Sequence, residues 1–132
     1  MKIFYIASAL SIVGLVLSMY LTLLPAPQFC EISSFISCDK VLSSPYAYFL
    51  GVPTAFYGVV WFALASSALF LAGERKKAAK FMTFWSFVGL AAVAVLVYVE
   101  IVLIDALCLL CTGAHVLVVA VSGLVFYAVK NR

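Results

Sequence analysis

The sequence predicts an all-α membrane protein, a bundle of four transmembrane helices with an outward-facing loop and short helix between the first two. Three observations lead to this fold class. Hydrophobic residues make up 67% of the 132-residue chain and charged residues only 10%, and the mean hydropathy is +1.25, values that soluble domains rarely combine. The apolar residues gather in runs close to the roughly 20 residues that a helix needs to cross a bilayer. The basic residues all lie outside these runs.

The expected helices cover about residues 3–24, 53–72, 81–104 and 108–129, and with their connections they make residues 1–132 a single domain. We expect helices rather than strands because backbone groups in lipid must form their hydrogen bonds within one segment. The first run carries no charge and ends at Pro25 and Pro27. It is longer than the roughly 7 to 15 apolar residues of a signal-peptide core, so we expect it to be retained as a helix.

The connection between the first two helices is the longest one. Ser37 can cap a short helix over about residues 39–44, which Pro45 would stop. Residues 46–50 follow, and they are too apolar for a solvated loop and rich in the aromatic residues that settle at membrane interfaces. Pro53 suits the first turn of the second helix, where its missing N–H matters least.

The third run holds one acidic residue, Glu100, near its end.

The basic residues predict the orientation, because positive charges near helix ends stay preferentially in the cytoplasm. With four spans, three groups of basic residues fall on one side of the membrane: Lys2; Arg75, Lys76, Lys77 and Lys80; Lys130 and Arg132. Only Lys40 is left on the other side. We therefore expect an integral, multi-pass membrane protein with both termini in the cytoplasm. The net charge of +3 is explained by topology, and no nucleic acid is expected as a partner.

The four cysteines, Cys30, Cys38, Cys108 and Cys111, all fall on the outer side in this topology. That side, whether periplasmic or extracellular, permits disulfides where the cytosol does not. For Cys30 and Cys38, a purely structural disulfide remains open at this point. A zinc site is disfavoured because the seven-residue spacer of this pair departs from the usual two to four. No metal is expected.

Cys108 and Cys111 form a C-x-x-C motif at the start of the fourth helix. The partial positive charge and unpaired N–H groups of a helix N-terminus stabilise a thiolate, so this pair is expected to exchange between thiol and disulfide. His115 shares the stripe of these cysteines, since residues three and four apart lie on one helix face. An ionisable residue inside the bilayer indicates a functional site, and the alternative for His115 is a structural hydrogen bond to a neighbouring helix. Glu100 and Asp105 lie near the outer end of the span; we expect them to solvate a helix end, and assistance with proton uptake is the alternative.

The combined motifs resemble the vitamin K epoxide reductase (VKOR) family in its prokaryotic form. The resemblance rests on Cys30-x7-Cys38, Ser44, Gly58 and the C-x-x-C pair, and on the stretches 14–20 and 36–44; it covers the chain from about Gly14 to His115. It implies an enzyme, a disulfide-generating quinone reductase built as a four-helix bundle around the quinone. Electrons would come from a separate thioredoxin-fold (DsbA-like) protein, and the activity would support disulfide formation.

The resemblance also implies a role for each cysteine. Cys30 is similar to the loop cysteine that exchanges with the partner, and Cys38 to its mate, which passes electrons to Cys108. Cys111 would then face the quinone. In this order two electrons move from the partner through Cys30 and Cys38 to Cys108 and Cys111, and on to the quinone.

Ser44, Thr54, Tyr57 and His115 are the quinone contacts that the resemblance implies. Two of them depart from the vertebrate pattern, since His115 stands where a tyrosine is found there and Thr54 where an asparagine is found. Histidine and threonine can still donate a hydrogen bond. A quinone such as menaquinone or ubiquinone therefore stays the expected electron acceptor, within a protein surrounded by membrane lipids.

A second class of function is the alternative to the enzyme, namely a small four-helix transporter or a structural membrane subunit with structural disulfides. A proton-coupled transporter would be expected to carry an acidic residue near mid-membrane, and Glu100 lies too near the outer end. A structural subunit would have no need of C-x-x-C.

Overall fold

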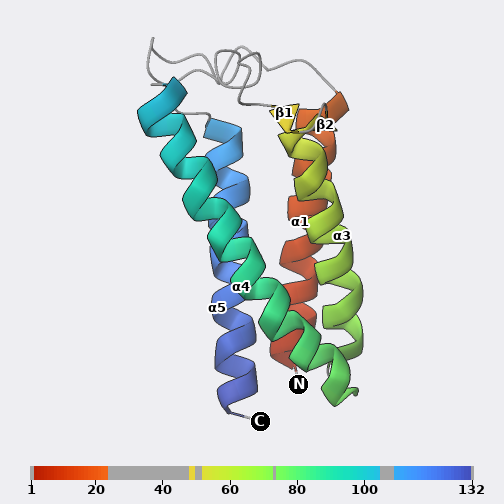
Figure 1. The fold of residues 1–132 in the computed structure, drawn as a ribbon. Coiled ribbons are helices and arrows are strands. Elements are labelled where there is room, and N and C mark those ends of the chain that lie inside the picture. The colour runs from red at the N-terminus through yellow and green to blue at the C-terminus, as the bar shows by residue number, and fades with distance from the viewer. Residues whose placement is uncertain (1, 24–47, 50–51, 73, 105–108, 132) are drawn as a thin grey trace.

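The computed structural model of the protein describes residues 2–23, 48–49, 52–72, 74–104 and 109–131. Its long helices are α1 (Lys2–Leu23), α3 (Thr54–Ala72), α4 (Lys76–Tyr98) and α5 (Leu109–Lys130) (Figure 1). All four are long and apolar enough to cross a membrane, which confirms the expected fold class. The short helix expected over residues 39–44 lies outside the described residues.

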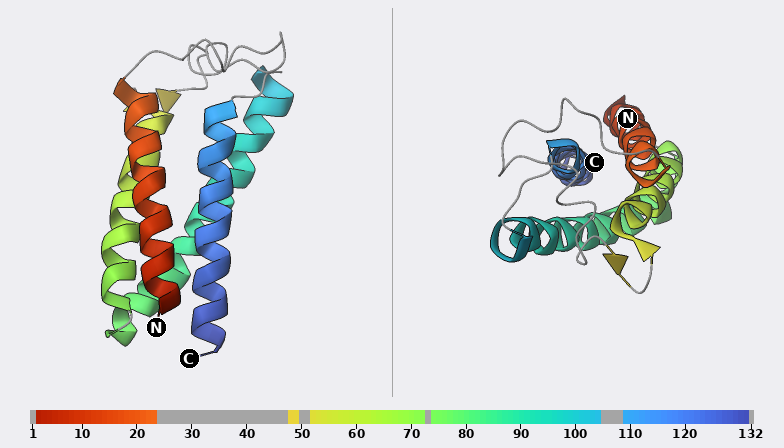
Figure 2. Two further views of the ribbon diagram at one scale, coloured as in Figure 1. Left: turned by 180° about the vertical axis from the view of Figure 1, so that it is seen from behind. Right: turned by 90° about the horizontal axis from the view of Figure 1, so that it is seen from above.

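The four helices form a ring in which each contacts two neighbours. α1 packs against α3 and α5, and α4 packs against α3 and α5. Viewed along the bundle, α4 runs obliquely from its start beside α3 to its end near α5 (Figure 2). The described ends of α1 and α5 next to the chain termini lie at the same end of the bundle (Figure 1). An even number of spans produces this arrangement.

The helix α4 differs in two ways from the helix expected over residues 81–104. α4 begins at Lys76, well before Phe81, because the backbone N–H of Ala79 already donates to the carbonyl of Arg75. Long lysine side chains let a helix extend past the apolar region, since their stems can lie along apolar surface while the ammonium groups reach water. At its other end α4 continues into a π-helical turn, η3 (Val99–Ile104), which the hydropathy pattern does not predict.

A short antiparallel strand pair precedes α3. β1 (Tyr48–Phe49) pairs with β2 (Val52–Pro53), with Tyr48 opposite Pro53. α3 therefore begins at Thr54, directly after Pro53. The strand pair lies at the end of the bundle away from the termini (Figure 1).

The buried apolar core extends from the middle of the bundle to the end that carries the termini. Its largest fully buried apolar side chains are Phe4, Phe62, Leu69, Met82, Val121 and Val125. α1 and α3 approach closely because Gly14 has no side chain, and a Cβ atom there would collide with the ring of Phe62. Small residues at helix contacts are the usual way for transmembrane helices to pack. We call this half, which holds the buried core, the filled half.

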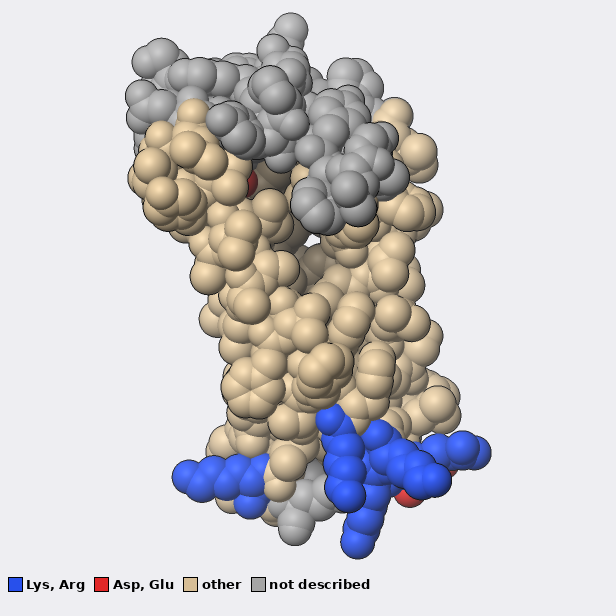
Figure 3. All heavy atoms as spheres, in the orientation of Figure 1, with Lys and Arg blue, Asp and Glu red and all other residues tan. Residues whose placement is uncertain are grey.

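Lysine and arginine side chains gather at the same end (Figure 3). We call it the basic end, after the described residues Lys2, Arg75, Lys76, Lys77, Lys80 and Lys130. The sides of the bundle carry exposed apolar residues instead, among them Val16, Phe84, Phe87 and Val95. An apolar side surface with charges at its end is the pattern of a protein embedded in a bilayer.

Candidate functional site

A cavity of about 390 Å³ occupies the half of the bundle away from the basic end. Figure 3 shows the molecule hollowed there, between α4 on one side and α1 and α3 on the other. All four long helices line it: Ser18, Leu21 and Thr22 from α1; Thr54, Ala55, Tyr57, Gly58, Val60, Trp61 and Phe62 from α3; Trp85, Val88, Gly89, Ala92, Val93 and Leu96 from α4, followed by Val99 and Glu100 of η3; and Cys111, Ala114, His115 and Val118 from α5. A largely apolar wall with a few polar groups is typical of a small-molecule site.

Trp61 and Trp85 close the cavity toward the filled half of the bundle. The indole N–H of Trp61 donates to the backbone carbonyl of Trp85 at 3.2 Å, and the indole N–H of Trp85 donates to the carbonyl of Trp61 at 3.1 Å. The two rings stack with centroids 6.3 Å apart and an interplanar angle of 13°. Buried indole N–H groups need such partners. The reciprocal bonds join α3 to α4 where the two helices begin to diverge.

Glycine makes room for this pair. A Cβ atom on Gly89 would lie 2.6 Å from Cζ2 of Trp61, so only glycine lets the ring lie against α4. On the opposite side of α3, a Cβ atom on Gly58 would lie 2.8 Å from Oγ of Ser18. The cavity wall formed by α3 is thus held tightly against both α1 and α4.

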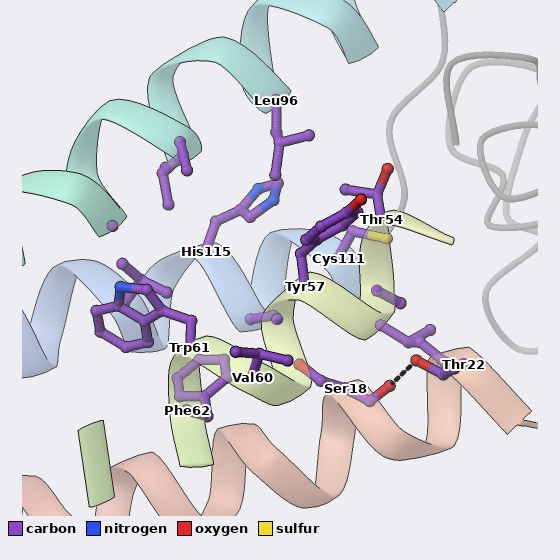
Figure 4. Close-up of a pocket in the computed structure, with 18 of the residues that line it drawn as sticks. Ser18, Thr22, Thr54, Tyr57, Val60, Trp61, Phe62, Leu96, Cys111 and His115 are labelled. Atoms are coloured by element: carbon purple, nitrogen blue, oxygen red, sulfur yellow. Dashed lines mark hydrogen bonds between the residues drawn. The ribbon is translucent and has the colours of Figure 1, made fainter. Parts of the chain in front are cut away.

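Cys111 lies in the first turn of α5 and is half-buried at the cavity wall. In Figure 4 its sulfur lies on the side of the cavity where Thr54 and Tyr57 project from the start of α3. A thiol here meets the positive end of the α5 dipole, which favours the thiolate. The arrangement brings a cysteine and two hydroxyl groups to one end of an apolar cavity.

His115 lies one turn along α5 from Cys111 and points toward Leu96 of α4 (Figure 4). Its Nδ1 atom is buried and has no hydrogen-bond partner among the described residues. A buried nitrogen without a partner is unfavourable. The ring therefore presents an unused hydrogen-bonding atom at a cavity that has room for a ligand.

Glu100 is the residue for which the sequence favoured helix-end solvation over a role in proton uptake. Its side chain is only 4% exposed, it lines the cavity, and Oε2 has no partner among the described residues. The expectation that it solvates a helix end is wrong, because this residue is buried at the cavity wall rather than exposed to water. The clue in the sequence was a single acidic residue within an apolar run, which is costly in lipid unless it faces the protein interior.

Four of the expected site residues meet in this cavity, namely Thr54, Tyr57, Cys111 and His115. The other four, Cys30, Cys38, Ser44 and Cys108, lie outside the described residues. Within the described part of the chain, no three His, Cys, Asp or Glu side chains are grouped so that they could hold a metal ion. The chemistry available in the described cavity is that of a thiol, a carboxyl, an imidazole and hydroxyl groups.

The family model described as "Vitamin K epoxide reductase family" matches residues 5–128, nearly the whole chain. No curated protein matches the sequence significantly.

Proposed function

The chain belongs to the vitamin K epoxide reductase family of membrane oxidoreductases, and we propose that it is a thiol:quinone oxidoreductase that reoxidises a thioredoxin-fold partner. Quinones and thioredoxin-like partners are general features of this family. The observation that carries the proposal is the apolar cavity that holds Cys111 together with His115, Thr54 and Tyr57. The alternative function, that of a small transporter or a structural subunit, does not account for membership of this family.

The residues of the cavity fit a quinone substrate. A quinone ring is flat and apolar, and it accepts hydrogen bonds at two carbonyl oxygens. The cavity of about 390 Å³ lies within the range of about 300 to 1,000 Å³ of small-molecule pockets, and stacked indoles form one wall. His115, Thr54 and Tyr57 supply possible hydrogen-bond donors. Ser44 is proposed as a further contact.

We propose the following relay for the electrons. A thiolate of the reduced partner attacks the Cys30–Cys38 disulfide, and a second partner thiol resolves the mixed disulfide, so that the partner leaves oxidised. Cys38 then attacks Cys108 and displaces Cys111. When Cys30 attacks Cys38 in turn, the outer disulfide reforms and the inner pair is left as a dithiol. Closing the inner disulfide releases two electrons and two protons, which convert a quinone to a quinol.

The orientation proposed for this relay follows from the charges. Cys111 lies in the half of the bundle away from the basic end. If the basic residues face the cytoplasm, the inner pair lies near the outer surface, where a secreted or periplasmic partner can reach the loop that holds Cys30 and Cys38. Oxidised partner would then introduce disulfides into other proteins outside the cell.

Thiol trapping in membranes tests the proposed function. The protein is reduced with a dithiol, freed of the dithiol under anaerobic conditions, treated with menadione, and labelled with a maleimide that shifts its mobility. We expect the Cys108–Cys111 pair to become resistant to labelling only when menadione is present. A pair that stays labelled after menadione addition would contradict the proposal.

Three variants sharpen this experiment. Cys111→Ser should abolish the quinone-driven protection. Cys30→Ala should leave protection of the inner pair intact but abolish turnover with a thioredoxin-fold dithiol protein; equal turnover would overturn the assigned order. Val116→Ala is the matched control, because Val116 is next to His115 in α5 but is 60% exposed on the outside of the bundle, and it should behave as the unaltered protein.

A further inference from the structure

Glu100 stands out from the other buried polar side chains. The described side chains with a buried nitrogen or oxygen atom and no hydrogen-bond partner are Ser11, Ser86, Glu100, His115 and Ser122. The three serines do not line the cavity, whereas Glu100 and His115 do. A buried hydroxyl without a partner is unfavourable, and a buried ionised carboxylate without a partner is far more so. Its presence needs a reason that the packing of the helices does not supply.

The backbone around Glu100 is also unusual. Glu100 lies in the π-helical turn η3, directly after α4. π-helical turns are rare, and they occur frequently at functional sites. Leu96, about one turn before Glu100, lines the same cavity beside His115 (Figure 4). Glu100 thus reaches the cavity from the helix that faces α5, the helix of Cys111 and His115.

The reaction in this cavity requires an acid. A quinone that accepts two electrons must also accept two protons, and a cavity with apolar walls offers little water to supply them. Acidic side chains inside membranes commonly carry protons. A buried carboxyl without a partner is held most easily in its neutral form, in which it can donate a proton.

We propose that Glu100 donates a proton to a carbonyl oxygen of the quinone as the inner cysteine pair reduces it; this inference rests on the proposed function. The inner dithiol loses two electrons and two protons while its S–S bond forms, and the quinone gains two electrons and two protons. Glu100 transfers its own proton to the quinone oxygen and recovers one of the protons released by the dithiol. The carboxyl is therefore unchanged over a full cycle.

Glu100→Gln tests this role, because the amide keeps the size and hydrogen-bonding ability of the side chain but cannot supply the proton. We expect the rate at which menadione reoxidises the prereduced inner pair to fall by about 10²-fold or more, as for loss of a general acid. Menadione affinity should change by less than about threefold, because the hydrogen bond is kept. Affinity is measured separately, from quenching of Trp61 and Trp85 fluorescence. Glu74→Gln, an exposed acid at the basic end, is the matched control and should leave both quantities unchanged.

The outcomes separate this inference from the proposed function. If the unaltered protein itself does not reoxidise with menadione, the proposed function fails. If it does and E100Q reoxidises within about threefold of its rate, only the role of Glu100 is overturned. The role is also overturned if weaker menadione binding accounts for the whole loss of rate.

A second pair of variants covers the case in which E100Q does not accumulate in the membrane. Glu100→Asp and Glu100→Asn are equal in size, but only the first keeps the acid. We expect the Asp variant to reoxidise at least about tenfold faster than the Asn variant, since general acids contribute about 10²-fold or more. Equal rates in the two variants would overturn the proposal.

Discussion

The two indole N–H groups at the cavity wall illustrate how single residues define this site. Each N–H is bonded to the backbone carbonyl of the other tryptophan, so neither ring has a donor left for a ligand. Trp61 and Trp85 are therefore a rigid apolar surface, against which a flat ring can stack. The hydrogen-bonding capacity of the cavity comes from other residues, including His115 and Glu100, whose buried atoms have no partner among the described residues.

This arrangement predicts a direct binding signal. The chain has two tryptophans and both line the cavity, so menadione bound there should quench most of the tryptophan fluorescence in a saturable way. His115→Leu should weaken this binding by about twofold to tenfold, the effect of losing one hydrogen bond of about 0.5 to 1.5 kcal/mol. The measurement is a fluorescence titration in detergent, with Val116→Ala as the control. Quenching that does not saturate would show that menadione merely collides with the protein surface.

At the scale of the helices, glycines set the distances at which the bundle packs. Gly14 receives the ring of Phe62 at the contact of α1 with α3, and Gly89 receives the ring of Trp61 at the contact of α3 with α4. The second contact also determines where α4 starts to diverge from α3 and hence where the cavity begins.

Gly89→Ala should consequently destabilise the bundle and disturb the cavity together. The new Cβ atom would lie 2.6 to 2.7 Å from atoms of the Trp61 ring, and the indole N–H of this ring is held by a hydrogen bond to the backbone carbonyl of Trp85. We expect a loss of about 1 to 3 kcal/mol, typical of overpacking, seen as a lower apparent unfolding temperature in detergent and weaker menadione quenching.

The control for this substitution is Gly123→Ala in α5. Apart from its chain neighbours and the nearby backbone of its own helix, a Cβ atom on Gly123 would meet no described heavy atom within 4 Å, and alanine is favoured over glycine in a helix by about 1 kcal/mol. This variant should be at least as stable as the unaltered protein. An equal loss of stability in both variants would argue against a specific contact at Gly89.

The helices were predictable, but their local geometry was not. Long apolar runs report that a segment is stable in lipid only as a helix, so the four spans follow from the sequence. The spacing from Cys111 to His115 also predicted that both share a helix stripe, and both line the cavity. The π-helical turn η3 and the inward position of Glu100 depend on how α4 packs. Hydropathy carries no information about hydrogen-bond register, and a helix that is apolar on all sides does not show which face is buried.

The reciprocal bonds of Trp61 and Trp85 could not be predicted for a related reason. They depend on the relative height of α3 and α4 in the bundle, which is set by tertiary packing. The start of α4 at Lys76 likewise reflects lysine side chains that tolerate a helical position at the membrane surface. Sequence patterns thus identified the thiol and imidazole chemistry and offered Glu100 only as an alternative, whereas packing revealed the buried carboxyl and the aromatic wall.

Across the whole molecule, stability and chemistry occupy opposite halves. The filled half holds the buried core from Phe4 to Ala128 and ends in the described basic residues. The other half holds the cavity, where α4 has diverged from α3 (Figure 2). A well-packed half can keep the helices in register while the open half admits a ligand. This polarity implies that the orientation in the membrane decides which compartment the cysteines serve.

The orientation can be measured by labelling single cysteines introduced at the two ends. In a background with all four native cysteines replaced by alanine, Glu74→Cys marks the exposed turn before α4 at the basic end, and Leu23→Cys marks the last residue of α1 at the opposite end, where Leu23 is 73% exposed. Because basic residues are retained in the cytoplasm, a membrane-impermeant maleimide should label L23C in intact cells and E74C only after permeabilisation. The reverse result would place the C-x-x-C end in the cytosol, where reducing conditions oppose disulfide formation, and the proposed export of disulfides would have to be abandoned.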